Sequence, residues 1–81
     1  MNIKECKKQL VFPKWGTPVK TRPYKGVEPG GFLVSKDLID NRKKATGKYI
    51  GFAAGAGGDV WYVVHDDGSI AAYSTIEVFD Q

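Results

Sequence analysis

Apolar and polar positions alternate most clearly in the second half of the chain. Residues 59–65 are β-branched or aromatic nearly throughout and predict the clearest strand. Residues 66–69 contain an Asp-Gly pair and predict a tight turn, because this pair supplies the positive φ angles that short hairpins need. Residues 70–73 predict the returning strand. Residues 47–53 predict a further strand, in which Gly51 marks a bend or a bulge.

The remaining strands are predicted to be short. Residues 19–22 alternate and read as a first strand that Pro23 stops. Residues 74–77 have the Ser-x-x-Glu form of a capping box and predict one helical turn, followed by a last strand at residues 78–79. About five short strands with a single helical turn before the last predict a mainly β fold, a small and strongly bent barrel.

The first part of the chain gives weaker signals. Residues 3–10 fit either a short helix or a flexible arm, and the prolines in residues 12–18 forbid both helix and central strand. Ser35 is placed to cap a short helix or a turn. We therefore divide the chain into an N-terminal arm or short helix (residues 1–16) and a barrel (residues 17–81).

The two faces of the strand at residues 59–65 differ in character. An all-apolar set suits the core: Val60, Tyr62 and Val64. A mixed set suits a partly exposed surface or an interface: Trp61, Val63 and His65. A barrel this small is not expected to leave Trp61 uncovered, since burying a large side chain contributes about 1.5–3 kcal/mol. In one interpretation Trp61 packs in the core or against the N-terminal arm. In the other it contacts a second subunit or a ligand.

Composition narrows the class of protein. The chain has 81 residues, of which 42% are apolar and 26% charged, as in an ordinary globular domain. Cys6 is the single cysteine, which excludes an intramolecular disulfide, and with one histidine the monomer cannot fill a four-ligand zinc site. No apolar run approaches the roughly 20 residues of a membrane span, and the N-terminus lacks a signal-peptide core. We expect a cytoplasmic protein with no membrane contact, metal ion or cofactor.

Charge is divided unevenly along the chain. Residues 1–50 contain all 12 lysines and arginines and carry a net charge of +8, whereas residues 51–81 carry −5. The division fits a nucleic-acid footprint, a self-complementary surface for association, or two halves that neutralise each other within one fold. The sequence leaves these three explanations open.

No catalytic residues are predicted. The glycines of residues 55–58 predict a hairpin loop rather than a phosphate cradle, because no Gly-Lys-Ser/Thr follows them. Asp66 and Asp67 belong to the predicted turn. His65 is the only side chain whose ordinary pKa lies near neutrality, and no nucleophile motif accompanies it.

A binding site is predicted from exposed rings and nearby charges. Aromatic faces beside cations can stack bases or hold a cationic or proline-rich ligand. The predicted ligand-contacting side chains are Trp61, Tyr73, Tyr49, Trp15 and His65. The predicted charge contacts are Arg42 and Lys44, within the basic run at residues 42–44.

The stretch from Gly47 to Glu77 carries a resemblance. Its sequence includes GKYIG, GGDVWYV, HDDG and a later AYS. In this order the motifs resemble small bacterial SH3-like β-barrel proteins, over roughly the last 35 residues. The resemblance implies an SH3-like barrel, a fold whose members mostly bind peptides, modified side chains or nucleic acid.

The layout is also similar to the plasmid-borne type II dihydrofolate reductases. These short chains have a Val-Phe-Pro segment, as at residues 11–13, and a strand-turn-strand unit that ends in tyrosine. In that family four barrels surround a pore where a Gln-Ile-Tyr stretch contacts folate and nicotinamide. The matching positions are Ala71, Ala72 and Tyr73, of which only Tyr73 fits; the ligand-binding amide is absent at residue 71.

From these observations we expect a non-catalytic binding or assembly module that recognises a protein or peptide through an aromatic barrel face. Two alternatives stay open: an oligomeric pore enzyme of the reductase type, and a nucleic-acid-binding barrel that uses the basic half. Opposite charges and an exposed Trp61 face also favour a homo-oligomer, a dimer or a tetramer.

Overall fold

The computed structural model describes residues 13–27, 34–55 and 58–81. The arm or helix predicted over residues 3–10, together with Cys6, lies outside these ranges.

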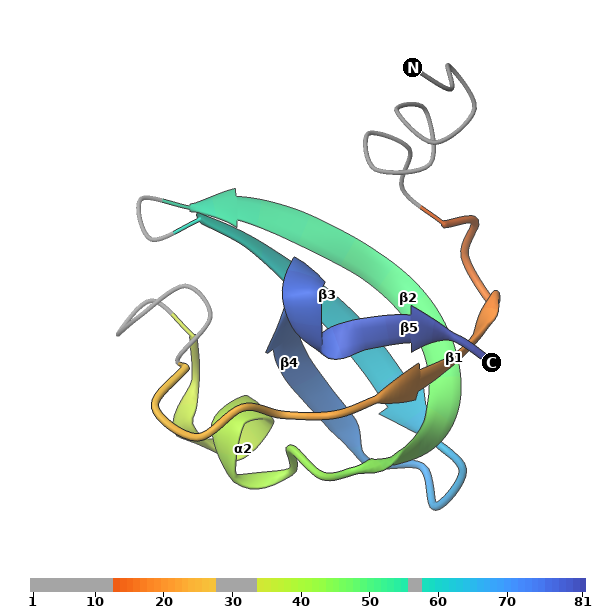
Figure 1. Cartoon of the computed structure of the whole chain (residues 1–81), viewed down its shortest axis with the longest axis horizontal. Helices are drawn as coiled ribbons and strands as arrows, with labels where there is room; N and C mark the ends of the chain where they lie inside the picture. Colours follow the sequence, from red (N-terminus) through yellow and green to blue (C-terminus); the bar gives the residue numbers. More distant parts are fainter. Residues whose placement is uncertain (1–12, 28–33, 56–57) are drawn as a thin grey trace.

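The described residues form one antiparallel sheet of five strands (Figure 1). The elements follow one another as β1 (Pro18–Thr21), α2 (Lys36–Asp40), β2 (Ala45–Gly55), β3 (Gly58–His65), β4 (Ile70–Ser74), the 3₁₀ turn η2 (Thr75–Glu77) and β5 (Val78–Asp80). The strand order is β4-β3-β2-β1-β5, an open sheet bounded by β4 and β5. The prediction of a mainly β fold with five strands and a helical turn before the last is confirmed. No helix in the described ranges is long and apolar enough to cross a bilayer.

The long strand β2 bends where the sequence predicts a bulge. Its register with β3 shifts between Tyr49 and Phe52, and Gly51, which lies between them, has a φ of 125°. Residues with a side chain rarely adopt this backbone conformation, so glycine allows the strand to turn here. Figure 1 shows β2 curving strongly along its length.

Both predicted local signals near the C-terminus are also confirmed. Gly68 has a φ of 88° in the turn between β3 and β4, which the amide of His65 closes by donating to the carbonyl of Ser69 at 2.8 Å. Ser74 and Glu77 form a reciprocal capping box around η2. Ser35 likewise caps α2, since its hydroxyl accepts from the amide of Leu38.

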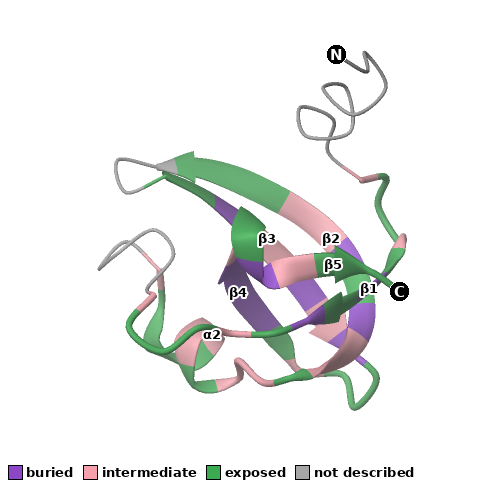
Figure 2. Cartoon of the chain, viewed as in Figure 1, coloured by how far each residue is buried: buried purple, intermediate pink, exposed green. Residues whose placement is uncertain are grey.

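The core cluster lies on one face of the sheet and consists of Val19, Tyr49, Val63, Ala71 and Tyr73 (buried residues are purple in Figure 2). Trp61 and Val78 pack against it. The face of β3 that reaches this cluster is therefore the mixed one, with Trp61, Val63 and His65, and not the all-apolar one. Val60 is buried as well, but Tyr62 and Val64 are only half-buried.

The cross-strand partners explain this orientation. Val63 lies opposite Tyr49 on β2 and the small Ala71 on β4, so side chains of different size fill the space between the strands. His65 tolerates burial because both of its ring nitrogens find partners. The prediction that the all-apolar face supplies the core holds for Val60 and is wrong for Tyr62 and Val64, because hydrophobicity alone does not show which residues lie across the sheet.

Candidate functional site

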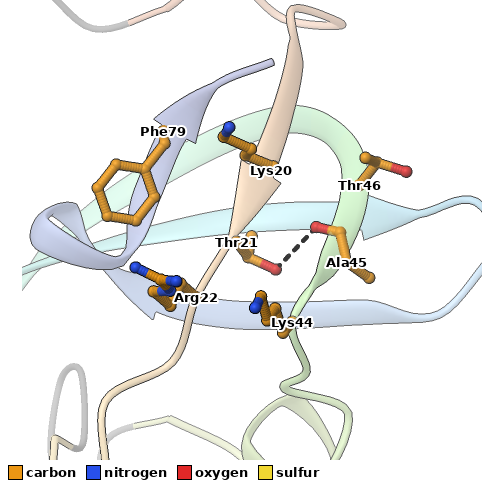
Figure 3. A pocket seen from close by; sticks show the side chains of 7 residues that line it. All are labelled: Lys20, Thr21, Arg22, Lys44, Ala45, Thr46 and Phe79. Carbon is orange, nitrogen blue, oxygen red and sulfur yellow. Dashed lines mark hydrogen bonds between the residues drawn. The ribbon is translucent and has the colours of Figure 1, made fainter.

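A groove of about 470 Å³ crosses the sheet where β1 lies between β2 and β5. Figure 3 shows its side chains: Lys20, Thr21, Arg22, Lys44, Ala45, Thr46 and Phe79. Three of the seven are cations and none is a carboxylate. The lining thus combines positive charge with one aromatic ring.

Strand pairing sets the order of the side chains across this groove. Lys20 on β1 lies directly opposite Thr46 on β2 and Phe79 on β5. Paired residues project from the same face of a sheet, so the three form one row. The two neighbours of Lys20 on β1, Val19 and Thr21, are buried, and Lys20 is exposed. The alternation of β1 therefore presents Lys20 to solvent.

Thr21 fixes the connection between the two strands at the base of the groove. Its hydroxyl lies 2.6 Å from the carbonyl oxygen of Lys43 and 3.2 Å from that of Ala45. The second of these contacts is drawn in Figure 3. Because the hydroxyl is buried, it holds the entry of β2 against β1 and thereby places the neighbouring Lys44 beside the groove.

The groove cations are not neutralised by the ion pairs of the described residues. These pairs join Lys36 to Asp40, Arg42 to Glu77 and Lys43 to Asp67. None of them includes a cation of the groove: Lys20, Arg22 or Lys44. Their like charges in one hollow create a positive potential that attracts anions.

Arg42, a predicted charge contact, has a different role. Its side chain is only 9% exposed and pairs with the fully buried carboxylate of Glu77. It also donates to the carbonyl of Val27 at 2.5 Å and lies 5.5 Å above the ring centroid of Tyr73. The guanidinium is therefore held within the fold, whereas Lys44, the other predicted charge contact, is exposed and lines the groove.

Tyr73 and His65, predicted to contact ligand, are joined to each other in the interior. Nε2 of His65 lies 2.6 Å from the hydroxyl of Tyr73, and Nδ1 lies 3.0 Å from the carbonyl oxygen of Thr46. A carbonyl only accepts, so Nδ1 carries a proton. The amide of Lys43 donates to the same hydroxyl at 2.9 Å. These contacts leave both side chains buried in the single chain and away from its surface.

The other predicted aromatic residues are divided between core and surface. Tyr49 is buried, and burial raises its pKa. Its ring meets the partly buried ring of Trp61 edge to face at 5.3 Å. Trp15 is 76% exposed and lies over Gly51, where an added Cβ would approach Nε1 of Trp15 to 3.3 Å. The predicted aromatic residues therefore do not gather on one open face of the chain.

The acidic turn residues have structural partners. Asp67 accepts from Lys43 at 2.5 Å and from the hydroxyl and amide of Ser69, and these hydrogen bonds hold its pKa well below the usual range. Asp66 accepts from the hydroxyl of Thr46 at 2.5 Å. The described ranges contain no cluster of three or more His, Cys, Asp or Glu side chains that could hold a metal ion.

Sequence reasoning missed the contributions of Lys20, Arg22 and Phe79. A signal for the first two was present, because the alternation predicted over residues 19–22 places Lys20 and Arg22 on one side of a strand. The pairing of β1 with β5, which brings Phe79 beside Lys20, had no local signal. No family model, curated protein or solved structure matches this chain.

Proposed function

We propose that this domain is a non-catalytic binding module that recognises an anionic partner through the groove between β2, β1 and β5. The observation that carries the proposal is the lining itself: Lys20, Arg22 and Lys44 meet in one hollow without a carboxylate among the lining residues. Gathering like charges costs electrostatic energy in the free protein. An anion in the groove removes that cost, so charge complementarity favours binding.

The burial of the predicted aromatic residues favours this proposal over recognition of a peptide through an aromatic barrel face. Tyr49, Tyr73 and His65 are engaged in the core, so a ligand would have to open the fold to reach them. The groove is open and its cations are exposed to solvent at Lys20, Arg22 and Lys44.

The reductase alternative receives less support. The positions that match the ligand-contacting stretch of that family are Ala71, Ala72 and Tyr73, and all three are fully buried in the chain. The hydroxyl of Tyr73 is also occupied by His65 and by the backbone of Lys43. A pore site would need these side chains at an exposed surface.

We further propose that the sheet is an SH3-like barrel. Three features support this arrangement: the order β4-β3-β2-β1-β5, the bend of β2 at Gly51, and a 3₁₀ turn between the last two strands. Self-association and a cytoplasmic location stay predictions. Light scattering measures the first directly.

Titration with long-chain inorganic polyphosphate tests the proposed function. We expect salt-sensitive binding that weakens at least tenfold when the groove cations are replaced together (Lys20→Gln, Arg22→Gln, Lys44→Gln). The control carries the same loss of charge at three exposed lysines outside the groove (Lys14→Gln, Lys25→Gln, Lys48→Gln). It should weaken binding much less, because these charges lie outside the hollow.

Two results contradict the proposal. Wild-type protein that does not bind polyphosphate at low salt has no anion site. An equal loss in the groove variant and in the control means that net charge alone attracts the probe.

A further inference from the structure

Resting on the proposed function, we infer that the anionic partner of the groove is a single-stranded nucleic acid. Lys20, Arg22 and Lys44 contact its phosphates, and the ring of Phe79 stacks on a base.

The charges form a track along a strand. Lys20 and Arg22 are two residues apart on and just after β1, which places them roughly 7 Å from each other on the same side. Lys44 lies across the groove, just before β2. Cations on both sides of a hollow suit an extended chain of anions, and the backbone of a single nucleic-acid strand is such a chain.

The ring of Phe79 lies within the cationic track. It is directly opposite Lys20 in the pairing of β1 with β5, and 38% of the residue stays exposed. An exposed ring beside cations is the combination with which proteins hold single strands, because every base has a face that stacks on an aromatic side chain.

A duplex fits this groove less well than a single strand. Within a duplex the base faces are covered by their neighbours in the stack, so Phe79 would have no base to contact unless the stack opened. A peptide of aspartates and glutamates would satisfy the cations but has no aromatic base to stack on the ring. The single strand is therefore the ligand that uses both features.

A carboxylate, that of Asp66, lies beside the groove lining and disfavours phosphates on that side. Asp66 accepts from the hydroxyl of Thr46, which lines the groove. Its negative charge repels phosphates at this end of the lining. Replacing it by asparagine keeps an acceptor for Thr46 and removes the charge, so Asp66→Asn should raise affinity for the strand about twofold.

Fluorescence anisotropy with a labelled 12-nucleotide oligothymidine tests the inference, using the full chain and its variants. We expect Phe79→Leu to weaken binding about tenfold, the effect typical of losing one stacked base. Phe52→Leu is the matched control, because Phe52 is also a half-exposed phenylalanine and lies outside the groove lining. Phe79→Tyr retains a ring and should bind as the wild type does, which separates stacking from a fold defect.

The salt dependence supplies a second readout. Three phosphate contacts to a single strand predict that the logarithm of the association constant falls with the logarithm of salt concentration with a slope of about −2. The triple glutamine variant of the groove should bring the slope close to zero.

The inference and the proposed function fail in different ways. Equal binding of oligothymidine by Phe79→Leu and by the wild type, with polyphosphate binding still dependent on the groove cations, overturns the nucleic-acid assignment and leaves the anion site intact. Tighter binding of a labelled 12-residue oligoglutamate, or of a duplex, also overturns it. Loss of polyphosphate binding in the wild type removes the anion site itself.

Discussion

At the scale of single residues, the hydroxyl of Tyr73 organises buried polar groups from two parts of the chain. It lies 2.6 Å from Nε2 of His65 and 2.9 Å from the amide nitrogen of Lys43. Through Nδ1 of the same imidazole it is linked to the carbonyl of Thr46. One oxygen atom thus satisfies groups on β3 and on the segment that enters β2.

Removing this oxygen should destabilise the domain without changing its shape. We predict that Tyr73→Phe lowers the free energy of unfolding by about 1–3 kcal/mol, because the imidazole and the amide lose a buried partner. Urea unfolding at neutral pH measures the change. Tyr24→Phe is the control, since Tyr24 is 43% exposed. Equal stability of the Tyr73 variant and the control would mean that the buried hydrogen bonds contribute nothing net.

The burial of these residues could not be predicted from the sequence. A histidine beside two aspartates is typical of a surface turn, and a tyrosine at the end of a hairpin is typical of a binding face. Both are buried because they find hydrogen-bond partners inside the fold, the backbone groups of Lys43 and Thr46. These partners lie far from them along the chain. Local patterns carry no information on such partners.

At the scale of elements, β2 and β3 approach each other closely at Gly47. A Cβ placed on Gly47 would lie 2.5 Å from the carbonyl oxygen of Val64 and 2.8 Å from Cγ1 of Val63. Neither distance is tolerated, and the first involves backbone that cannot rotate away. The glycine is therefore required by the spacing of the two strands.

We predict that Gly47→Ala lowers stability by about 2 kcal/mol, the usual cost of overpacking a tight site. For a domain of this size the midpoint of thermal unfolding should fall by roughly 10 °C. Circular dichroism during heating measures it. Lys48→Ala is the control, because Lys48 is the exposed neighbour on the same strand. A similar midpoint for both variants would show that the strands separate at little cost.

Elements with a local cause were predictable. The bulge at Gly51, the turn at residues 66–69 and the capping box around η2 each depend on residue types close together in the sequence, and all three are present. The inward face of β3 was predicted wrongly because it depends on what lies across the sheet. The groove was missed for the same reason, since β1 and β5 meet from opposite ends of the chain.

At the scale of the whole molecule, Glu77 ties distant segments together. Its buried carboxylate pairs with Arg42, accepts from the amide of Tyr24 at 2.6 Å, and accepts from the amide of Ser74 at 2.8 Å. The three partners belong to the segment after β1, the segment before β2 and the end of β4. The side chain of Glu77 therefore anchors two connections to η2, the one that precedes α2 and the one that follows it.

We predict that Glu77→Gln lowers the free energy of unfolding by about 3 kcal/mol, because the guanidinium of Arg42 stays buried without a compensating charge. The control removes an exposed ion pair: Asp40→Asn frees Lys36 and should change stability by less than about 1 kcal/mol. Urea unfolding of both variants under one condition gives the comparison. Similar losses at the buried and the exposed pair would contradict the central position of Glu77.

The placement of β1 between β2 and β5 has a thermodynamic consequence for any molecule in the groove. Such an occupant touches all three strands at once, and they come from the beginning, the middle and the end of the described chain. It binds more tightly when β5 has docked on β1 and Phe79 completes the lining, so by mass action it favours the docked form over the undocked one. Occupancy of the groove should therefore slow hydrogen exchange at the paired amides of β5, which makes that edge strand a reporter of ligand.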